Sequence, residues 1–320
     1  KLRFVTVLEF IRQGVLPGAP LCGLLSSTEA LFLLPLMKQI RIHHLTEYGF
    51  SQDVELTEHR LLMRPREGHD IRIHSSRLEV SPAFETKWNR DIYGNSVGWL
   101  YLKEPSNILK IESEVVIENY AEQPLDFVVD RRAVTFPFSF EPEDRLDLIP
   151  YCTHTWPNHT KKLKQWVDRF WQPGQAIETY VLLDQMNRSI VADFGYGMRE
   201  EPGVQNPDTT LALRAGSCRD FAAFFIEACR YLGLPARFVS GYLLNPGSDQ
   251  HGSTHAWSEV YLPGAGWIGF DNTSGLVTGT EHIATAVHRH PEAIPPVSGS
   301  FISAQTVNSS MRVSVNVSEV

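Results

Sequence analysis

Cys218, His255 and Asp271 follow one another along the chain and have the side-chain types of a thiol-based acyl-transfer site. A thiolate is the reactive form of cysteine, an imidazole beside it can move its proton, and a carboxylate can orient that imidazole. Acyl transfer through a thioester needs this arrangement. Alone, the histidine would be interpreted as structural and the aspartate as a turn residue, so the prediction depends on the elements that bring the three together.

The segment that begins at Cys218 is predicted to be a helix with the thiol in its first turn. Apolar residues recur at helical spacing and form one face, namely Phe221, Phe224, Phe225, Ala228 and Leu232. Ser217 and Asp220 have the form of a capping box, and Gly233 marks the end of the helix. Because unpaired N–H groups at a helix N-terminus stabilise negative charge, this position favours a thiolate. Cys229, inside the helix, is interpreted as structural.

His255 and Asp271 are predicted to lie on the two strands of a hairpin. Alternation places His255 on one strand face with Trp257, Glu259 and Tyr261, and Asp271 on one face with Trp267 and Gly269. A turn centred on Gly264 and Ala265 predicts that Asp271 lies opposite Ser258, a few residues from His255. In that register a bulge, strand twist or longer loop must absorb an offset before the triad is complete.

Four motifs carry these residues and their surroundings. They are Gly-Ser-Cys-Arg-Asp-Phe at 216–221, Pro-Ala-Arg-Phe-Val-Ser-Gly-Tyr at 235–242, Thr-His-Ala-Trp-Ser-Glu-Val-Tyr at 254–261 and Gly-Trp-Ile-Gly-Phe-Asp at 266–271. Together they resemble the bacterial transglutaminase-like superfamily, over about residues 150 to 290. The resemblance implies that Cys218 is the nucleophile, His255 the general base and acid, and Asp271 the orienting carboxylate. It also implies hydrolysis of a peptide or side-chain amide rather than cross-linking.

One motif departs from the family pattern. After Asp271 many relatives have Pro-Thr-Asn-Gly, whereas this chain has Asn-Thr-Ser-Gly at residues 272–275. The oxyanion hole is also incomplete in the sequence, since the backbone N–H of Cys218 is one expected donor and no second donor is identified.

The expected fold class is α+β, with a papain-like, transglutaminase-like cysteine enzyme core preceded by an antiparallel β-sandwich-like domain. Its expected parts are a non-core N-terminal extension at 1–36, a β-rich domain at 37–140, a catalytic domain at 141–290 and a C-terminal segment with a terminal β-strand at 291–320. Short alternating runs predict the strands of the β-rich part, which resembles the domain preceding the core in one bacterial branch of the family. Residues 121–160 contain five prolines and match no regular period, so they are expected to connect the domains.

Composition excludes several other classes of protein. The net charge of −8 argues against a nucleic-acid partner, because phosphate binding needs clustered Lys and Arg. The four cysteines, at positions 22, 152, 218 and 229, are too scattered for a disulfide framework and favour the reducing cytoplasm. No Cys or His spacing matches a usual zinc site, so neither a metal nor a cofactor is expected. No apolar run reaches the ~20 residues that a membrane span requires.

The expected partner is a peptide or protein substrate, and the oligomeric state is left open. The alternative function is a non-catalytic peptide- or protein-binding module on the same fold. The presence of all three residues of the triad argues against that alternative. Rapid labelling of Cys218 near neutral pH would support the enzyme, and slow labelling would support the binding module.

Overall fold

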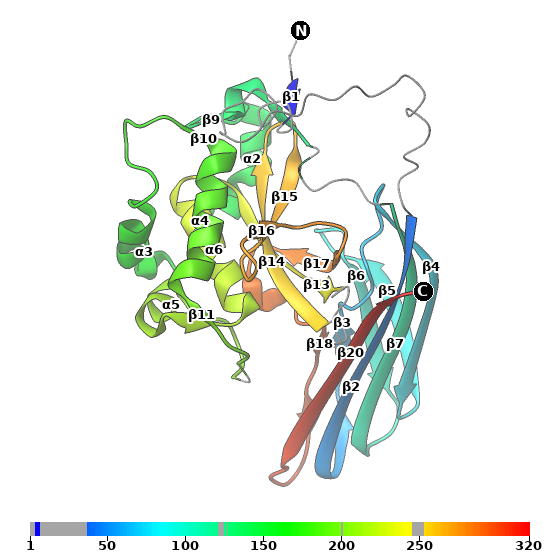
Figure 1. The fold of residues 1–320 in the computed structure, drawn as a ribbon. Coiled ribbons are helices and arrows are strands. Elements are labelled where there is room, and N and C mark those ends of the chain that lie inside the picture. Colours follow the sequence, from blue (N-terminus) through cyan, green and yellow to red (C-terminus); the bar gives the residue numbers. More distant parts are fainter. Residues whose placement is uncertain (1–3, 7–36, 121–124, 126, 200, 245–252) are drawn as a thin grey trace, which may run out of the picture.

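The computed structural model describes residues 4–6, 37–120, 125, 127–199, 201–244 and 253–320. Helices, a central antiparallel sheet and a pair of long β-sheets follow one another across the molecule (Figure 1). The α-helices and the central sheet come from residues 142–288, and most strands of the long sheets come from residues 37–120. This is the α+β organisation that the sequence predicts.

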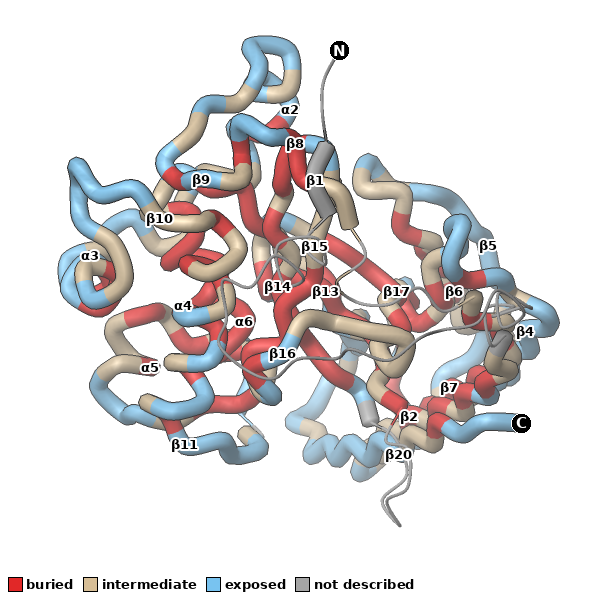
Figure 2. Tube along the Cα trace, turned by 45° about the horizontal axis from the view of Figure 1, so that its top comes forward, coloured by how far each residue is buried: buried red, intermediate tan, exposed pale blue. Residues whose placement is uncertain are grey.

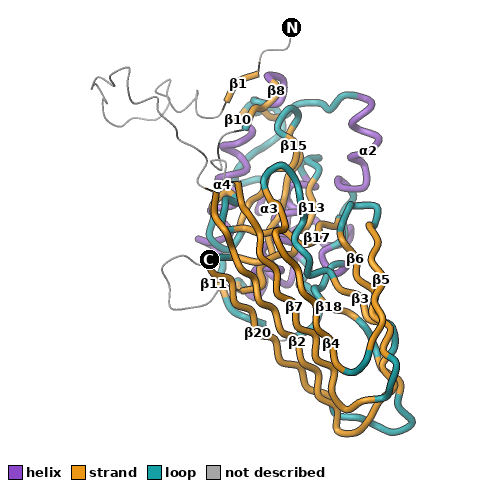
Figure 3. Tube along the Cα trace, turned by 90° about the vertical axis from the view of Figure 1, so that its right-hand side faces the viewer, coloured by secondary structure: helices purple, strands orange, loops and turns teal. Residues whose placement is uncertain are grey.

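Two antiparallel sheets form the β-sandwich (Figure 3). The first contains, in spatial order, β4 (Ile71–Ser81), β7 (Ser106–Tyr120), β2 (Met37–Leu56) and β20 (Ser309–Glu319), with β19 (Phe301–Ile302) beside the end of β2. The second contains β18 (Val297–Ser298), β3 (His59–Leu61), β6 (Ser96–Leu102) and β5 (Phe84–Arg90). Both sheets contribute to one buried cluster, which includes Val54, Leu61, Leu100 and Leu109.

A strand near the C-terminal end of the chain joins the sandwich, whereas a strand near the other end belongs to a separate two-stranded sheet. The C-terminal strand β20 pairs antiparallel with β2 from Ile40 opposite Glu319 to Phe50 opposite Ser309. Near the other end, β1 (Phe4–Thr6) pairs with β8 (Val128–Asp130). The rest of the expected extension, residues 1–3 and 7–36, lies outside the described residues. The predicted domain boundaries remain predictions, but strands β18, β19 and β20 join the sheets built by residues 37–120.

The central sheet carries the elements of the predicted site. Its strand order is β16 (Leu276–Val277), β15 (Gly266–Asp271), β14 (Ser253–Leu262), β13 (Ala236–Leu243) and β17 (His282–His288), all antiparallel. Helix α6 (Cys218–Tyr231) packs on β14 and β13, and α4 (Thr179–Asp193) contacts β16. Helices α3 (Thr160–Val167) and α5 (Pro207–Leu213) pack against α6. Figure 2 shows buried backbone along α6 and the central strands. Phe225 of α6 meets Phe270 of β15 with ring centroids 5.4 Å apart, so the helix that begins at Cys218 is held directly on the sheet.

Helix α6 is more deeply buried than one apolar face requires. Every residue from Asp220 to Arg230 is buried, including the charged pair Glu227 and Arg230, whose Oε1 and Nη1 atoms lie 3.0 Å apart. The pair supplies each buried charge with a partner, so polar positions of the helix can also face the interior.

One helix lies where the sequence predicted no regular structure. Helix α2 (Pro142–Cys152) falls within residues 121–160 and buries only Leu148, while Leu146 and Ile149 are exposed. Without a continuous apolar stripe its periodicity is weak, and proline is compatible with a first helical turn. Among the described residues, no helix has the length and apolar character needed to cross a membrane.

Candidate active site

The N-terminus of α6 fixes the position of Cys218. Ser217 precedes the helix in an extended conformation, and its backbone N–H and hydroxyl both donate to Oδ2 of Asp220 at 2.8 Å. Immediately upstream, β12 (Ala215–Gly216) pairs with β11 (Gly195–Tyr196). The capping box predicted from Ser217 and Asp220 is confirmed, and it defines the residue at which the helix begins.

Asp220 also anchors the segment around Arg199 and Gln205, which precedes the helix in the sequence. Its buried carboxylate accepts from Nε and Nη2 of Arg199 at 2.8 and 3.1 Å and from the backbone N–H of Gln205 at 2.9 Å. Burial acts to raise the pKa of Asp220, but Arg199, Gln205 and Ser217 outweigh it and lower the pKa. The carboxylate is therefore an ionised anchor for the start of α6.

The Cys218 thiol is half-buried at the first residue of this 14-residue helix. None of the described residues accepts a hydrogen bond from the Cys218 backbone N–H. Such N–H groups of a first helical turn stabilise negative charge placed next to them. A thiolate, or an oxyanion formed beside it, would have this donor available.

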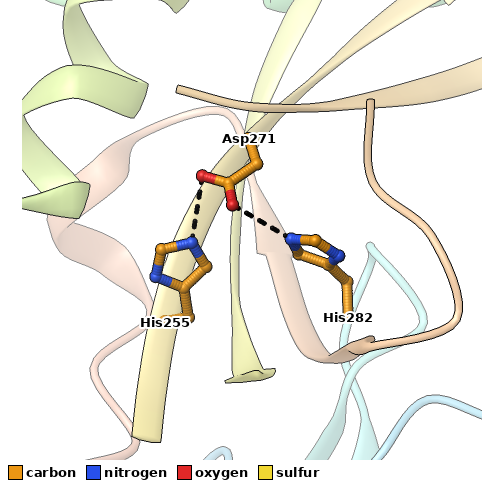
Figure 4. Close-up of side chains that lie close together, drawn as sticks. All are labelled: His255, Asp271 and His282. Carbon is orange, nitrogen blue, oxygen red and sulfur yellow. Dashed lines mark hydrogen bonds and ion pairs between the residues drawn. The ribbon is translucent and has the colours of Figure 1, made fainter. Parts of the chain in front are cut away.

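His255 and Asp271 form a buried pair between β14 and the end of β15 (Figure 4). Nε2 of His255 lies 3.1 Å from Oδ1 of Asp271, and the two side chains are only 6% and 4% exposed. The ring is not aligned for a hydrogen bond, so the contact is best described as an ion pair. Burial lowers the pKa of His255, but the Asp271 carboxylate and the neighbouring Cys218 thiol outweigh burial and raise the pKa to about 9. The imidazole is therefore stabilised in its protonated form.

The hairpin register explains how these two side chains meet, and it corrects the predicted one. Leu262 pairs with Gly266, and Ser258 pairs with Phe270, so Asp271 comes next, across from Trp257 rather than Ser258. The turn is one residue shorter than predicted because Gly264 and Gly266 adopt positive φ angles of 84° and 76°. A shift of one residue changes the strand face, so Asp271 shares the face of His255 without a bulge.

His282, on β17, is a site residue that the sequence analysis missed. Its Nε2 lies 3.2 Å from Oδ2 of Asp271, and its Nδ1 accepts from the backbone N–H of Gly279 at 3.2 Å. Since Nδ1 accepts, the proton of the neutral ring lies on Nε2, and His282 donates to Asp271. Figure 4 shows the carboxylate between the two imidazoles. The local sequence carried no signal for this contact. Strand β17 reaches the site by pairing with β13, which lies on the opposite side of β14 from β15.

The Asp271 carboxylate has several partners. Besides the ion pair with His255 and the hydrogen bond from His282, the backbone N–H of Thr273 donates to Oδ1 at 2.9 Å. Burial acts to raise the pKa of Asp271, but His255, His282 and Thr273 outweigh it and hold the pKa well below its ordinary value. The group is a fixed anion that can hold the His255 ring and stabilise its positive charge.

Comparison with known proteins agrees with this geometry. Residues 172–272 match the model of the transglutaminase-like superfamily, and residues 40–118 match the bacterial transglutaminase-like N-terminal region. An uncharacterized protein of Mycobacterium tuberculosis is 30% identical over 315 residues, which cover 91% of this chain and 96% of that protein. The chain belongs to the transglutaminase-like superfamily.

Two further likenesses concern the core of this superfamily member. A crystal structure from Cytophaga hutchinsonii, provisionally described as a cysteine protease, has a TM-score of 0.69 and 22% identity, and covers 89% of this chain and 91% of that one. It confirms the predicted fold class. A peptide-N(4)-(N-acetyl-beta-glucosaminyl)asparagine amidase of Rattus norvegicus is 37% identical over 62 residues, or 19% of this chain and 8% of that protein.

The loop after Asp271, which departs from the common pattern of this transglutaminase-like family, is anchored by a buried amide network. Ser258 Oγ donates to Oδ1 of Asn272 at 2.9 Å, and Nδ2 of Asn272 donates to Oδ1 of Asn187 at 2.8 Å. All three side chains are fully buried. Hydrogen bonds therefore hold Asn272 in place next to Asp271, at the position where many relatives have proline.

The cluster of His255, Asp271 and His282 has the ligand types of a metal site. The ligand atoms of His255, Asp271 and His282 all lie within 4.8 Å of one another. Protons on the two rings account for the observed contacts, since His282 donates to the Asp271 carboxylate and His255 forms an ion pair with it. The expectation that this transglutaminase-like protein uses no metal remains a prediction.

Proposed function

We propose that the protein is a cysteine hydrolase that cleaves a peptide or side-chain amide through a thioester on Cys218. The observation that carries the proposal is the buried pair of His255 and Asp271 beside a thiol at a helix N-terminus. A non-catalytic module has no need for a buried carboxylate that stabilises an imidazolium next to a thiol.

In the proposed reaction, Sγ of Cys218 attacks the amide carbonyl carbon and the carbonyl electrons move to the oxygen. The backbone N–H of Cys218 stabilises that oxyanion. When the C–N bond breaks, the amine leaves with a proton from His255, and a thioester remains on Cys218. His255 then accepts a proton from water, which attacks the thioester, and the carboxylic acid product leaves with the thiol restored.

Three observations support this choice of reaction and setting. The Cytophaga hutchinsonii protein is described as a protease, and the rat protein is named as an amidase. Cys152, Cys218 and Cys229 are free thiols, which suits a reducing compartment such as the cytoplasm. The proposed substrate is therefore a peptide or protein amide inside the cell, and water is the proposed acceptor.

Mass spectrometry on the purified protein tests the proposal. The protein is incubated with a peptide library containing glutamine and asparagine, with and without a fluorescent primary amine. Peptide cleavage or deamidation that depends on Cys218 is the expected result, together with iodoacetamide labelling of Cys218 near neutral pH. The matched control is Cys152→Ala, because burial raises the pKa of the Cys152 thiol and this cysteine lies outside the site.

Amine incorporation in place of hydrolysis would show that the protein is a cross-linking enzyme and not a hydrolase. Slow labelling of Cys218 with no turnover of any peptide would overturn the enzyme proposal and favour the binding module.

A further inference from the structure

A cavity lies beside the proposed active site. Its volume is about 530 Å³, within the range of roughly 300–1,000 Å³ that is usual for ligand pockets. Its wall combines residues 66–71, between β3 and β4, with residues of the central sheet, among them Arg237, Trp257, Glu259 and His282. The β13–β14 register pairs Arg237 with Glu259, on the strand face that also carries His255. The cavity is therefore built on the same sheet face as the proposed catalytic histidine.

The cavity does not include the proposed nucleophile. Neither Cys218 nor His255 lines it, whereas His282 and Trp257 do. The rings of Trp257 and His282 meet edge to face with centroids 5.3 Å apart, and Nε2 of His282 reaches Asp271. A ligand here would contact the group that holds Asp271 without occupying the thiol, so the cavity is a separate site.

The guanidinium groups of Arg66 and Arg237 and the carboxylate of Glu259 line the cavity. Nε of Arg237 lies 2.6 Å from Oε2 of Glu259, and the Arg237 guanidinium lies 4.1 Å from the centroid of the Trp267 ring. Arg66 has neutral partners, since its Nη1 donates to the Tyr93 carbonyl at 3.1 Å and to Oδ1 of Asn95 at 2.5 Å. Arg237 thus has an anionic partner, whereas Arg66 has none among the described residues.

Arg66 is the cavity residue whose positive charge and remaining N–H donors an anion could pair with. Burial lowers the pKa of Arg66 and the nearby positive charge of Arg237 lowers it further, while the carboxylates of Glu259 and Asp91 act in the opposite direction without forming an ion pair with Arg66. No acceptor for Nε or Nη2 of Arg66 lies among the described residues. A planar guanidinium with free donors matches a carboxylate, which it can bind through two parallel hydrogen bonds.

Two exposed carboxylates limit the charge of the ligand. Glu67 and Asp70 both line the cavity and are exposed. Their negative charges would repel a multiply charged anion more strongly than a singly charged one. We propose that this cavity binds a small molecule or peptide end through a single carboxylate group, paired with Arg66.

Calorimetric titration of the Cys218→Ala protein tests this proposal without interference from turnover. The probes are N-acetyl-L-alanine, its uncharged amide, and inorganic phosphate as a more highly charged anion. The expected result is binding of the acid at one site and no binding of the amide. Arg66→Gln should weaken binding of the acid by roughly 10- to 100-fold, as expected for the loss of a charged hydrogen-bond pair. The matched control Arg77→Gln, at an exposed arginine of β4, should leave it unchanged.

Asp70→Asn provides a variant that should fold normally, because the side chain is exposed. Removing this like charge should tighten binding of the acid. The proposal is overturned if the amide binds as well as the acid, or if phosphate binds more tightly than the acid. It is also overturned if Asp70→Asn leaves binding unchanged, or if a folded Arg66→Gln protein binds like the parent.

Discussion

Nε2 of His255 lies 3.1 Å from Oδ1 of Asp271, and both side chains are buried. The pKa shifts of the two groups have opposite directions and one common cause, because each charged form stabilises the other. The pair can therefore keep the imidazole protonated beside Cys218 around neutral pH.

Asp271→Asn should lower kcat/KM at neutral pH by about 10²- to 10⁴-fold, less than Cys218→Ala, which should abolish turnover. Without the carboxylate charge, burial is opposed only by the Cys218 thiol, and the pKa of His255 should fall. NMR titration of His255 together with steady-state kinetics measures both effects. Asp184→Asn, at a surface ion pair, is the control and should change neither.

The raised pKa of His255 predicts a pH-dependent contribution to stability. A group whose pKa is higher in the folded than in the unfolded state stabilises fully below the unfolded pKa. That stabilisation should be lost as the pH rises from 6.5 through about 9. The comparison is made in the Cys218→Ala protein, so that no thiol of the site titrates in the same range. Urea unfolding should show a larger loss of the free energy of unfolding in Cys218→Ala than in Cys218→Ala/His255→Gln. Equal losses in the two proteins would contradict the assigned shift.

His282→Ala should lower kcat/KM by roughly 10- to 100-fold, because Asp271 loses a hydrogen bond to a buried charge. His282→Gln keeps a donor near the position of Nε2 and should restore part of the activity. A shift of the pH–rate profile in His282→Ala would show that the residue acts through Asp271 and His255. His74→Ala, at a side chain that is 63% exposed, is the control. Equal activity in the two alanine variants would exclude a positioning role for His282.

Arg230→Met should lower the free energy of unfolding by about 3–5 kcal/mol, because the buried Glu227 carboxylate loses the Arg230 cation and keeps only its contacts with His154 and the Thr155 backbone N–H. Arg230 also donates to the backbone carbonyls of Tyr151 and Ala236 at 2.9 and 3.0 Å. The same substitution at Arg188, which pairs with Asp184 on the surface, should cost about 0.3–0.5 kcal/mol. Urea denaturation compares the two, and similar costs would show that the buried pair does not stabilise α6.

The sequence predicted the parts of the site that depend on local patterns. The capping residues and the apolar spacing after Cys218 predicted the helix start, and alternation predicted the strand faces of His255 and Asp271. The hairpin register was wrong by one residue, because it depends on the backbone angles of Gly264 and Gly266, which residue spacing does not determine.

Contacts between distant parts of the chain were beyond the reach of the sequence. His282 meets Asp271 because β17 pairs with β13, and no local periodicity specifies which strands of a sheet are neighbours. Helix α2 was missed because it buries only Leu148 and so has little amphipathic pattern. The pairing of β20 with β2 joins strands at opposite ends of the chain for the same topological reason.

The pH dependence of Cys218 alkylation tests the central claim most directly. In the wild type, iodoacetamide should modify Cys218 rapidly near neutral pH, because the protonated His255 ring beside it stabilises the thiolate. In His255→Ala, the rate should rise only where an ordinary thiol ionises, near a pH of about 8.5. The rate is measured by mass spectrometry of the peptide that contains Cys218. The same pH profile in both proteins would contradict the pairing of Cys218 with His255.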